Sequence, residues 1–279
     1  MTYRLQRLTW QLGGYLFLLL ILLIIAFPIY WILLTAVKPA SLTYTAKPAL
    51  WTWEPSLASF VELFQEYPFH LWMFNSLWVT IANCAIAVAV GTTASYSLSR
   101  LRYPGRQFLS GFFFFVYLVP ASLLFIPLYV ILSDYRLLDN LWGLTWTYLT
   151  FTIPFCTWIL KAYFAGIPID LEEAALVDGA NRLQALVRIL LPIAAPGIAA
   201  ATIFAFTLSW NEFLYAFIFL QDERKYTLSP GLTTLVYGDV FLWGQIMSGA
   251  VLMSVPVLFL YFFAQRFVVT GLTAGAVKG

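Results

Sequence analysis

Long uncharged apolar stretches follow one another along the chain, with short polar segments between them. Five of these stretches contain no charged residue: 11–37, 71–99, 107–133, 140–160 and 240–265. A sixth, 189–220, contains one, Glu212. A membrane-spanning helix needs about 20 predominantly apolar residues, and every stretch reaches that length. The pattern therefore predicts an all-α polytopic membrane protein with six transmembrane helices and a single domain over 1–279.

Composition agrees with this interpretation. The chain is 62% hydrophobic and only 10% charged, whereas a soluble domain carries roughly 25% charged residues. A net charge of +2 gives no reason to expect a nucleic-acid partner. Cys84 and Cys156 both lie inside apolar stretches and form no disulfide framework. The only histidine, His70, has no cluster of ligands beside it, so no metal site is predicted.

The basic residues of the connecting segments are unequally distributed. Of the 15 in the chain, ten lie on the side of the N-terminus and five on the other side. Because cytoplasmic loops carry an excess of Lys and Arg, both termini are expected in the cytoplasm. The uncharged stretch 10–37 is too long for a cleaved signal peptide and is interpreted as a retained first helix. Segments 38–70 and 221–239, rich in proline and aromatic residues, are expected as outside loops, with a turn at 229–231.

One polar segment, 169–192, does not fit a bilayer. Four of the 13 acidic residues lie within nine positions of it. Asp170 followed by Glu173 resembles a capping box that begins a helix, and Gly179 is placed to end that helix in a left-handed conformation. Asn181 followed by Gln184 could cap a second helix before a break at Pro192. Two such short helices are marginal alone in water. Spacing alone does not decide whether they dock on a partner or form an ordinary surface loop.

The same segment resembles the EAA signature of ABC importer permeases. Glu173-Ala174-Ala175, three residues, Gly179, nine residues, Ile189, one residue and Leu191-Pro192 match at every position. Segment 99–106, the pentapeptide 209–213 and the C-terminal end 271–279 resemble other parts of sugar permeases, and the end resembles the shorter permease of maltose transporters. The resemblance covers essentially the whole chain.

The resemblance implies a cytoplasmic coupling loop over 161–192, seated in a cleft of an ATP-binding subunit. The residues expected to couple to that subunit are Glu172, Glu173, Ala174, Ala175, Asp178, Gly179, Ala180, Ile189, Leu191 and Pro192. It also implies that the tail inserts between two ATPases, through Gly275, Ala276, Val277 and Lys278; a frayed terminus is the alternative.

The energy source is expected in a separate subunit. None of the five lysines follows a glycine, so the chain has no phosphate-binding loop of the GxxxxGK[ST] type. The permease itself is expected to be no enzyme and to hold no cofactor, ATP and Mg²⁺ being bound by the partner ATPases. The family's architecture implies two permeases (here a heterodimer), two ATPases and an extracytoplasmic solute-binding protein, in a bacterial inner membrane.

Two further sites stay open between functional and structural interpretations. Asn211 and Glu212 are a possible solute path or an interface between helices, and an intramembrane carboxylate usually faces the bundle interior or water. The outside residues Tyr237, Phe241 and Trp243 are candidates for contact with the binding protein; a loop at headgroup level is the alternative.

The expected function is import of a sugar or sugar-like solute, such as a di- or oligosaccharide or a glucoside osmolyte. A permease of the same family for a non-sugar solute such as glycerol phosphate is one alternative. An ion-coupled secondary transporter is another, but such carriers usually show internal repeats and several buried ionisable groups. An intramembrane hydrolase is not supported, because the chain contains no HExxH or GxSxG motif.

Overall fold

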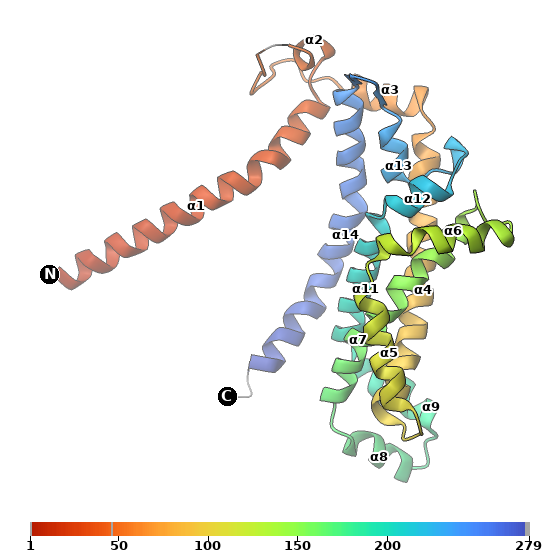
Figure 1. The fold of residues 1–279 in the computed structure, drawn as a ribbon. Coiled ribbons are helices and arrows are strands. Elements are labelled where there is room, and N and C mark those ends of the chain that lie inside the picture. The colour runs from red at the N-terminus through yellow and green to blue at the C-terminus, as the bar shows by residue number, and fades with distance from the viewer. Residues whose placement is uncertain (1, 46, 277–279) are drawn as a thin grey trace. The chain divides into compact units, whose positions relative to one another are not determined.

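The chain is almost entirely helical in the part described by its computed structural model, which covers residues 2–45 and 47–276, with side chains for 10–45 and 47–265. Figure 1 follows it from the N-terminal helix to the C-terminal one. Contacts divide the chain into two compact units, one from the described residues of 1–68 and 234–255, the other from those of 69–233 and 256–279. An all-α fold was expected and is confirmed.

The smaller unit contains the first helix and a small hairpin. Its elements are α1 (Thr2–Ala36), α2 (Ala40–Thr43), α3 (Ala58–Glu66), β1 (Val236–Tyr237), β2 (Val240–Phe241) and the beginning of α14 (Trp243–Ala276). The two strands pair antiparallel, Val236 with Phe241 and Tyr237 with Val240. Gly238 in the two-residue turn has φ of +57°, a left-handed conformation that glycine adopts without a steric penalty.

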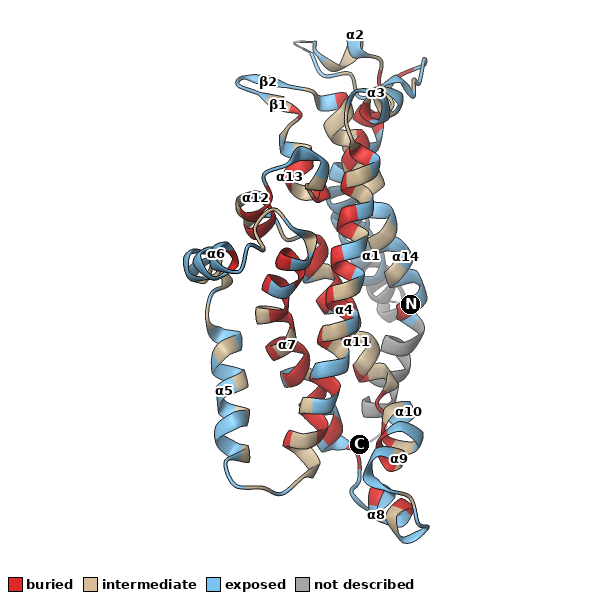
Figure 2. Cartoon of the chain, turned by 90° about the vertical axis from the view of Figure 1, so that its right-hand side faces the viewer, coloured by how far each residue is buried: buried red, intermediate tan, exposed pale blue. Residues whose placement is uncertain are grey.

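The larger unit holds the helical bundle. Its helices are α4 (Phe69–Arg100), α5 (Arg106–Leu118), α6 (Phe125–Asp134), α7 (Leu141–Gly166), α8 (Asp170–Val177), α9 (Arg182–Ala185), α10 (Leu191–Ile193), α11 (Ala195–Trp210), α12 (Leu214–Phe219) and α13 (Leu228–Thr233). Short 3₁₀ turns at 121–123 and 223–225 and a π-helical turn at 186–190 connect some of them. Figure 2 shows buried residues gathered along α4 and α7, whereas α5 has none.

Three described helices are long and apolar enough to span a bilayer: 10–36 of α1, 69–100 of α4 and 243–265 of α14. Two further pairs reach the same criterion only when a bent pair is counted as one span, α7 with α8 and the segment 182–193 with α11. The bends are 76° and 77°. Multiple membrane passes are therefore present, while the expected count of six stays a prediction.

Two apolar stretches that were expected to be single helices are broken. Stretch 107–133 forms α5 and α6, separated by Pro120 and a 3₁₀ turn. Stretch 189–220 forms α10, α11 and α12, with breaks at Ala194 and around Glu212. Proline lacks a backbone N–H and clashes within a helix interior, which accounts for the first break. Apolar length alone does not reveal such a break, since every residue around it is hydrophobic.

The core of the larger unit is the α4–α7 pair, which approaches closely at Gly91. A Cβ added there would lie 2.7 Å from Cβ of Cys156 and 3.2 Å from the backbone nitrogen of Thr157. One turn further on, the Ser95 hydroxyl donates to the Thr157 carbonyl at 2.8 Å. Helices in lipid associate through close packing of small residues and interhelical hydrogen bonds. This contact therefore sets the frame on which the remaining helices are placed.

The expected turn at 229–231 is wrong, because these residues belong to α13. Gly231 is required for packing: an added Cβ would lie 2.4 Å from the Trp72 ring of α4. The Trp72 indole N–H also donates to the Glu223 carbonyl at 2.8 Å, and Asn75 donates to the Arg224 and Tyr226 carbonyls. Two side chains of α4 therefore position the segment that was predicted to be a loop.

A charged contact fastens the α6–α7 connection to the segment after α12. The Lys225 ammonium donates to the Asp139 carboxylate at 2.6 Å, and the backbone N–H groups of Gln221 and Asp222 donate to the same carboxylate at 3.0 Å. Burial acts to raise the pKa of Asp139, but these hydrogen bonds outweigh it and lower that pKa below its usual range. The contact holds two connecting segments together beside the N-terminus of α7.

Gly91→Leu is expected to prevent correct packing of α4 on α7. Overpacking a tight core contact costs about 1–3 kcal/mol, and the backbone of α7 leaves no path for the new side chain. The measurement is the monodisperse fraction after detergent extraction and its thermal midpoint. Gly111→Leu on α5 is the control, since no heavy atom lies within 4 Å of a Cβ there. Equal behaviour of the two variants would contradict the assigned role of Gly91.

Candidate functional site: the loop between α7 and α11

The helix α8 lies at one end of the larger unit, beyond the ends of α4 and α7 (Figure 1). Its N-cap residue is Ile169, without a side-chain hydrogen bond, so the expected capping box from Asp170 to Glu173 is wrong. Glu172 instead turns inward and finds partners on other helices. The acidic first turn, Asp170, Glu172 and Glu173, still suits the positive end of the helix dipole.

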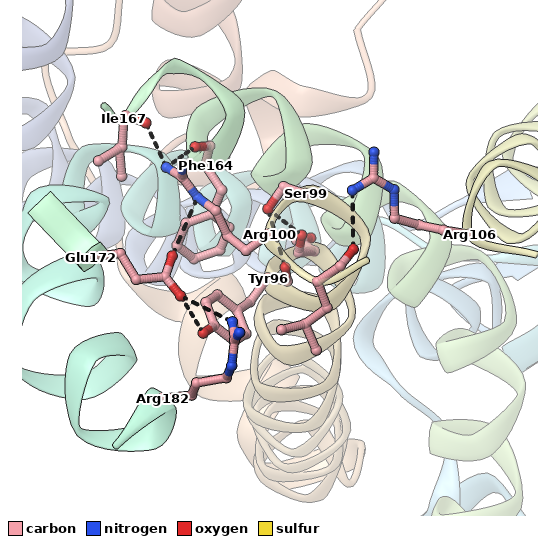
Figure 3. A network of polar contacts seen from close by, with 10 residues as sticks. Tyr96, Ser99, Arg100, Arg106, Phe164, Ile167, Glu172 and Arg182 are labelled. Carbon is pink, nitrogen blue, oxygen red and sulfur yellow. Dashed lines mark hydrogen bonds and ion pairs between the residues drawn. The ribbon is translucent and has the colours of Figure 1, made fainter. Parts of the chain in front are cut away.

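A network of polar contacts beneath α8 fixes its base (Figure 3). The Tyr96 hydroxyl donates to the Glu172 carboxylate at 2.7 Å. Arg100 Nε lies 3.9 Å from that carboxylate, and Arg182 lies 3.7 Å from it on the opposite side. The side chains of Arg100 and Glu172 are 6% and 5% exposed, so the charges compensate each other away from water.

Arg100 also closes the end of α7. Its terminal nitrogen donates to the carbonyls of Phe164 at 2.6 Å and Ile167 at 2.5 Å. The last carbonyls of a helix lack partners within the helix, and a cation is favourable at this negative end of the dipole. One side chain from α4 therefore caps α7 and holds the carboxylate of α8.

The second half of the loop is built as the sequence indicates. Gly179 has φ of +88°, so the expected left-handed ending of α8 is confirmed. The Asn181 side chain accepts from the Gln184 N–H at 2.9 Å, and the Gln184 side chain accepts from the Asn181 N–H at 2.9 Å. This reciprocal capping box is also confirmed. The chain then passes through α10 to the bend at Ala194, two residues after Pro192.

The ten residues expected to couple to an ATPase, which include the signature, divide into an inner and an outer face. Glu172 and Ala175 are buried, and the side chains of Ala180, Ile189 and Leu191 are half-buried. The remaining signature residues are exposed: Glu173, Ala174, Asp178, Gly179 and Pro192. A cavity of about 300 Å³ opens beside α8, between Arg102, Ile169, Glu173 and their neighbours. The outer face therefore remains free for a second molecule, while the inner face is already occupied.

Glu212 is paired inside the bundle. It lies at the break between α11 and α12, where its carboxylate accepts from the Tyr215 and Ala216 N–H groups at 2.9 and 3.1 Å and from the Tyr148 hydroxyl at 2.8 Å. It thus satisfies the free backbone donors at the beginning of α12. Asn211 is exposed, and its amide donates to the Thr207 carbonyl.

The remaining candidates lie on other elements. Tyr237, Phe241 and Trp243 of the hairpin and the first turn of α14 are 55%, 39% and 41% exposed, and the last two rings are stacked with centroids 5.1 Å apart. Of the predicted tail contacts, Gly275 and Ala276 end α14, and Val277 and Lys278 lie outside the described residues. The described residues contain no group of three His, Cys, Asp or Glu side chains able to hold a metal ion.

Sequence reasoning missed the partners of Glu172. Tyr96 and Arg100 lie near the end of a long apolar helix, where an arginine reads simply as a topological marker. The available signals were the arginine that directly follows this apolar stretch, the first of three within seven positions, and the later loop rich in carboxylates. Only the fold shows that Arg100 and Glu172 meet.

A bundle of membrane helices that carries such a loop at one end is the architecture of ABC importer permeases. The chain belongs to the family of binding-protein-dependent transport system inner membrane components, whose model matches residues 85–273. It is therefore a multi-pass inner membrane component of an ABC transporter, and the expected family is confirmed.

Individual relatives match over nearly the whole chain. The inner membrane ABC transporter permease protein YcjP of Escherichia coli is 36% identical over 98% of this chain and 99% of its own length. The sulfoquinovosyl glycerol transport system permease protein SmoH of Agrobacterium fabrum is 36% identical over 91% and 89%. A solved bacterial ABC transporter involved in the import of the acidic polysaccharide alginate has the same fold, with a TM-score of 0.80 at 22% identity over 92% of this chain and 95% of that one.

Glu172→Ala is expected to release α8 from the bundle. Breaking a buried ion pair from one side costs about 3–5 kcal/mol because the other charge remains unpaired. Thermal unfolding of the purified protein measures the loss. The double variant Glu172→Ala with Arg100→Met should lose clearly less than the sum of the two single variants, since the pair acts as a unit. Strictly additive losses would show that the two side chains are not coupled.

Glu212→Ala is expected to destabilise the junction of α11 and α12. The Tyr148 hydroxyl and two backbone N–H groups would lose their acceptor, and an unsatisfied buried polar group costs about 1–3 kcal/mol. The thermal midpoint in detergent should fall, while Asn211→Ala at the exposed neighbouring position should leave it unchanged. A Glu212→Ala variant as stable as the native protein would rule out this structural role.

Proposed function

We propose that this chain is one permease half of an ATP-driven importer for a sugar or sugar-like solute, and that α8 is the helix through which a separate ATPase drives it. The observation that carries the proposal is the two-faced construction of α8. Its inner face is clamped to α4 and α7 through Glu172, and its outer face presents Glu173 with the exposed apolar residue Val177. Val177 is 86% exposed.

The outer face has the composition of a docking surface. An eight-residue helix is too short to be stable alone in water, so it needs a surface to pack against. A partner that covers Val177 and pairs with Glu173 would supply such a surface. In this proposal the partner is an ATPase subunit, because the chain lacks a phosphate-binding loop of its own.

The inner clamp converts docking into movement. A nucleotide-driven change in the ATPase can shift the permease only if its states contact the loop with different free energies. The pairing of Glu172 with Arg100 then carries the displacement of α8 to the ends of α4 and α7.

The sugar class rests on named relatives. One relative belongs to a sulfoquinovosyl glycerol transport system. The solved transporter with the same fold is involved in the import of the acidic polysaccharide alginate. A carbohydrate or carbohydrate conjugate is thus the preferred solute class.

The assembly in this proposal contains a second, related permease, two ATPases and an extracytoplasmic binding protein. The basic residues of the connecting segments support cytoplasmic termini, with α8 on the same side. The exposed aromatic hairpin at 236–243 is then outside, where it could contact the binding protein. The predicted tail contact with the ATPases, from Gly275 to Lys278, is part of this proposal.

Glu173→Lys is expected to reduce solute uptake at least about tenfold while the protein still inserts and purifies normally. Reversing an interfacial charge costs several kcal/mol through like-charge repulsion, and 1.4 kcal/mol already corresponds to a factor of ten. The measurement is ATP-dependent uptake of labelled solute into proteoliposomes that contain the full transporter. Glu66→Lys on the exposed end of α3 makes the same charge change elsewhere and should transport normally.

Two outcomes would count against the proposal. Normal uptake by Glu173→Lys would reject the coupling role of α8. Uptake that follows an ion gradient and ignores ATP would instead favour a secondary transporter.

A further inference from the structure

A partly enclosed cavity of about 240 Å³ lies in the smaller unit, at the end of α1. The cavity is lined by Trp31 and Thr35 of α1, by Lys38, Leu42, Thr43, Thr45 and Pro48, and by Trp243 and Met247 of α14. A bond from the Ser248 hydroxyl to the Ala36 carbonyl, 3.4 Å long, holds α14 against α1 beside it. One water occupies about 30 Å³ of liquid, so the cavity holds a group of several non-hydrogen atoms. Apart from Trp243, none of its lining residues has a part in the proposed transport function.

The wall of this cavity carries a lysine without a counter-ion. Lys38 is 3% exposed, and its ammonium lies 4.2 Å from the centroid of the Trp31 ring. Among residues 10–45 and 47–265, no carboxylate pairs with it. The carboxylate of the neighbouring helix α3, Glu62, is already bonded to Gln245 at 2.6 Å. Burial lowers the pKa of Lys38, which is the response of an ammonium removed from water without an anion.

A second donor faces the same space. Thr35 is 6% exposed, and its hydroxyl has no hydrogen-bond partner in the described structure. The hydroxyls of Thr43 and Thr45, by contrast, are bonded to the carbonyls of Pro39 and Lys47. A buried polar group without a partner is uncommon in native proteins. Two donors, an ammonium without a counter-ion and a hydroxyl without a hydrogen-bond partner, therefore belong to residues that line the same cavity.

The surroundings indicate where an anion would come from. Helix α1 presents exposed apolar side chains such as Ile29 and Leu33, and in the same unit Trp51 and Trp53 are 57% and 89% exposed. Tryptophan is enriched at the headgroup level of membranes, and basic side chains at that level attract anionic lipids. A lipid phosphate could enter the cavity while its acyl chains lie along α1. The same donors would also hold free phosphate.

We propose that this cavity binds a phosphate-type anion between Lys38 and Thr35, with the Trp31 and Trp243 rings as its side walls. The Lys38 ammonium donates a charge-assisted hydrogen bond to an anion oxygen, and the Thr35 hydroxyl donates a second. The ligand restores the charge balance that the chain itself leaves incomplete. This inference does not depend on the transported solute or on the ATPase.

The test compares bound anion in the purified transporter assembly. Native mass spectrometry would count phosphatidylglycerol retained after reconstitution into nanodiscs with and without that lipid, and a parallel arm would titrate inorganic phosphate. Lys38→Met is expected to weaken binding at least about tenfold, because a hydrogen bond to a charged group is lost. Lys47→Met, at an exposed position of the same segment, should bind like the native protein. Retention of phosphatidylglycerol alone identifies a lipid site, and binding of phosphate alone identifies a site for a free anion.

Thr35→Val keeps every charge and nearly the same shape, so it tests the site even if Lys38→Met does not assemble. It should weaken binding less than Lys38→Met does, and Lys38→Arg should preserve binding. The proposal is overturned if Lys38→Met and Thr35→Val both bind as the native protein does. It is equally overturned if a carbodiimide joins Lys38 to a carboxylate of another subunit, since the cavity would then hold a protein side chain.

Discussion

The pairing of Glu172 with Arg100 is the constraint on which the arrangement of the loop depends. Neither charge is stable alone at 5–6% side-chain exposure. Together they bind the end of α4, the last carbonyls of α7 and the first turn of α8 into one cluster. A short helix that could not fold by itself is thereby given a fixed position at the end of the bundle. Its outer face is left free as a consequence.

The bundle that supports this cluster depends on close approach. Gly91 and Ser95 let α4 and α7 pack backbone to backbone, and Gly231 admits the Trp72 ring. In lipid, apolar side chains gain little by leaving the solvent, so packing and hydrogen bonds must provide the specificity. Glu212 follows the same logic, since it supplies acceptors to donors that lipid cannot satisfy. These contacts explain why small and polar residues recur on the inner faces of otherwise apolar helices.

Local signals were read correctly from the sequence where they depend on neighbouring residues. Gly179 and the Asn181–Gln184 box are such cases, because a cap is decided within four positions. Signals that depend on distant partners were not readable. Asp170 looks like a cap, but Glu172 is drawn inward by Arg100, and the apparent turn at 229–231 is a helix packed on Trp72. The breaks in stretches 107–133 and 189–220 were missed because a long apolar stretch indicates that a segment lies in lipid but does not indicate where its helix ends or bends.

The most direct measurement is site-specific photo-crosslinking in the assembled transporter. A photoreactive residue at Val177, on the outer face of α8, should be captured by an ATPase subunit, and the yield should change when ATP is bound. The same residue at Ala175, on the buried face, should link within the chain. Capture of an extracytoplasmic protein from position 177, or no ATPase product there at all, would contradict the coupling role of α8.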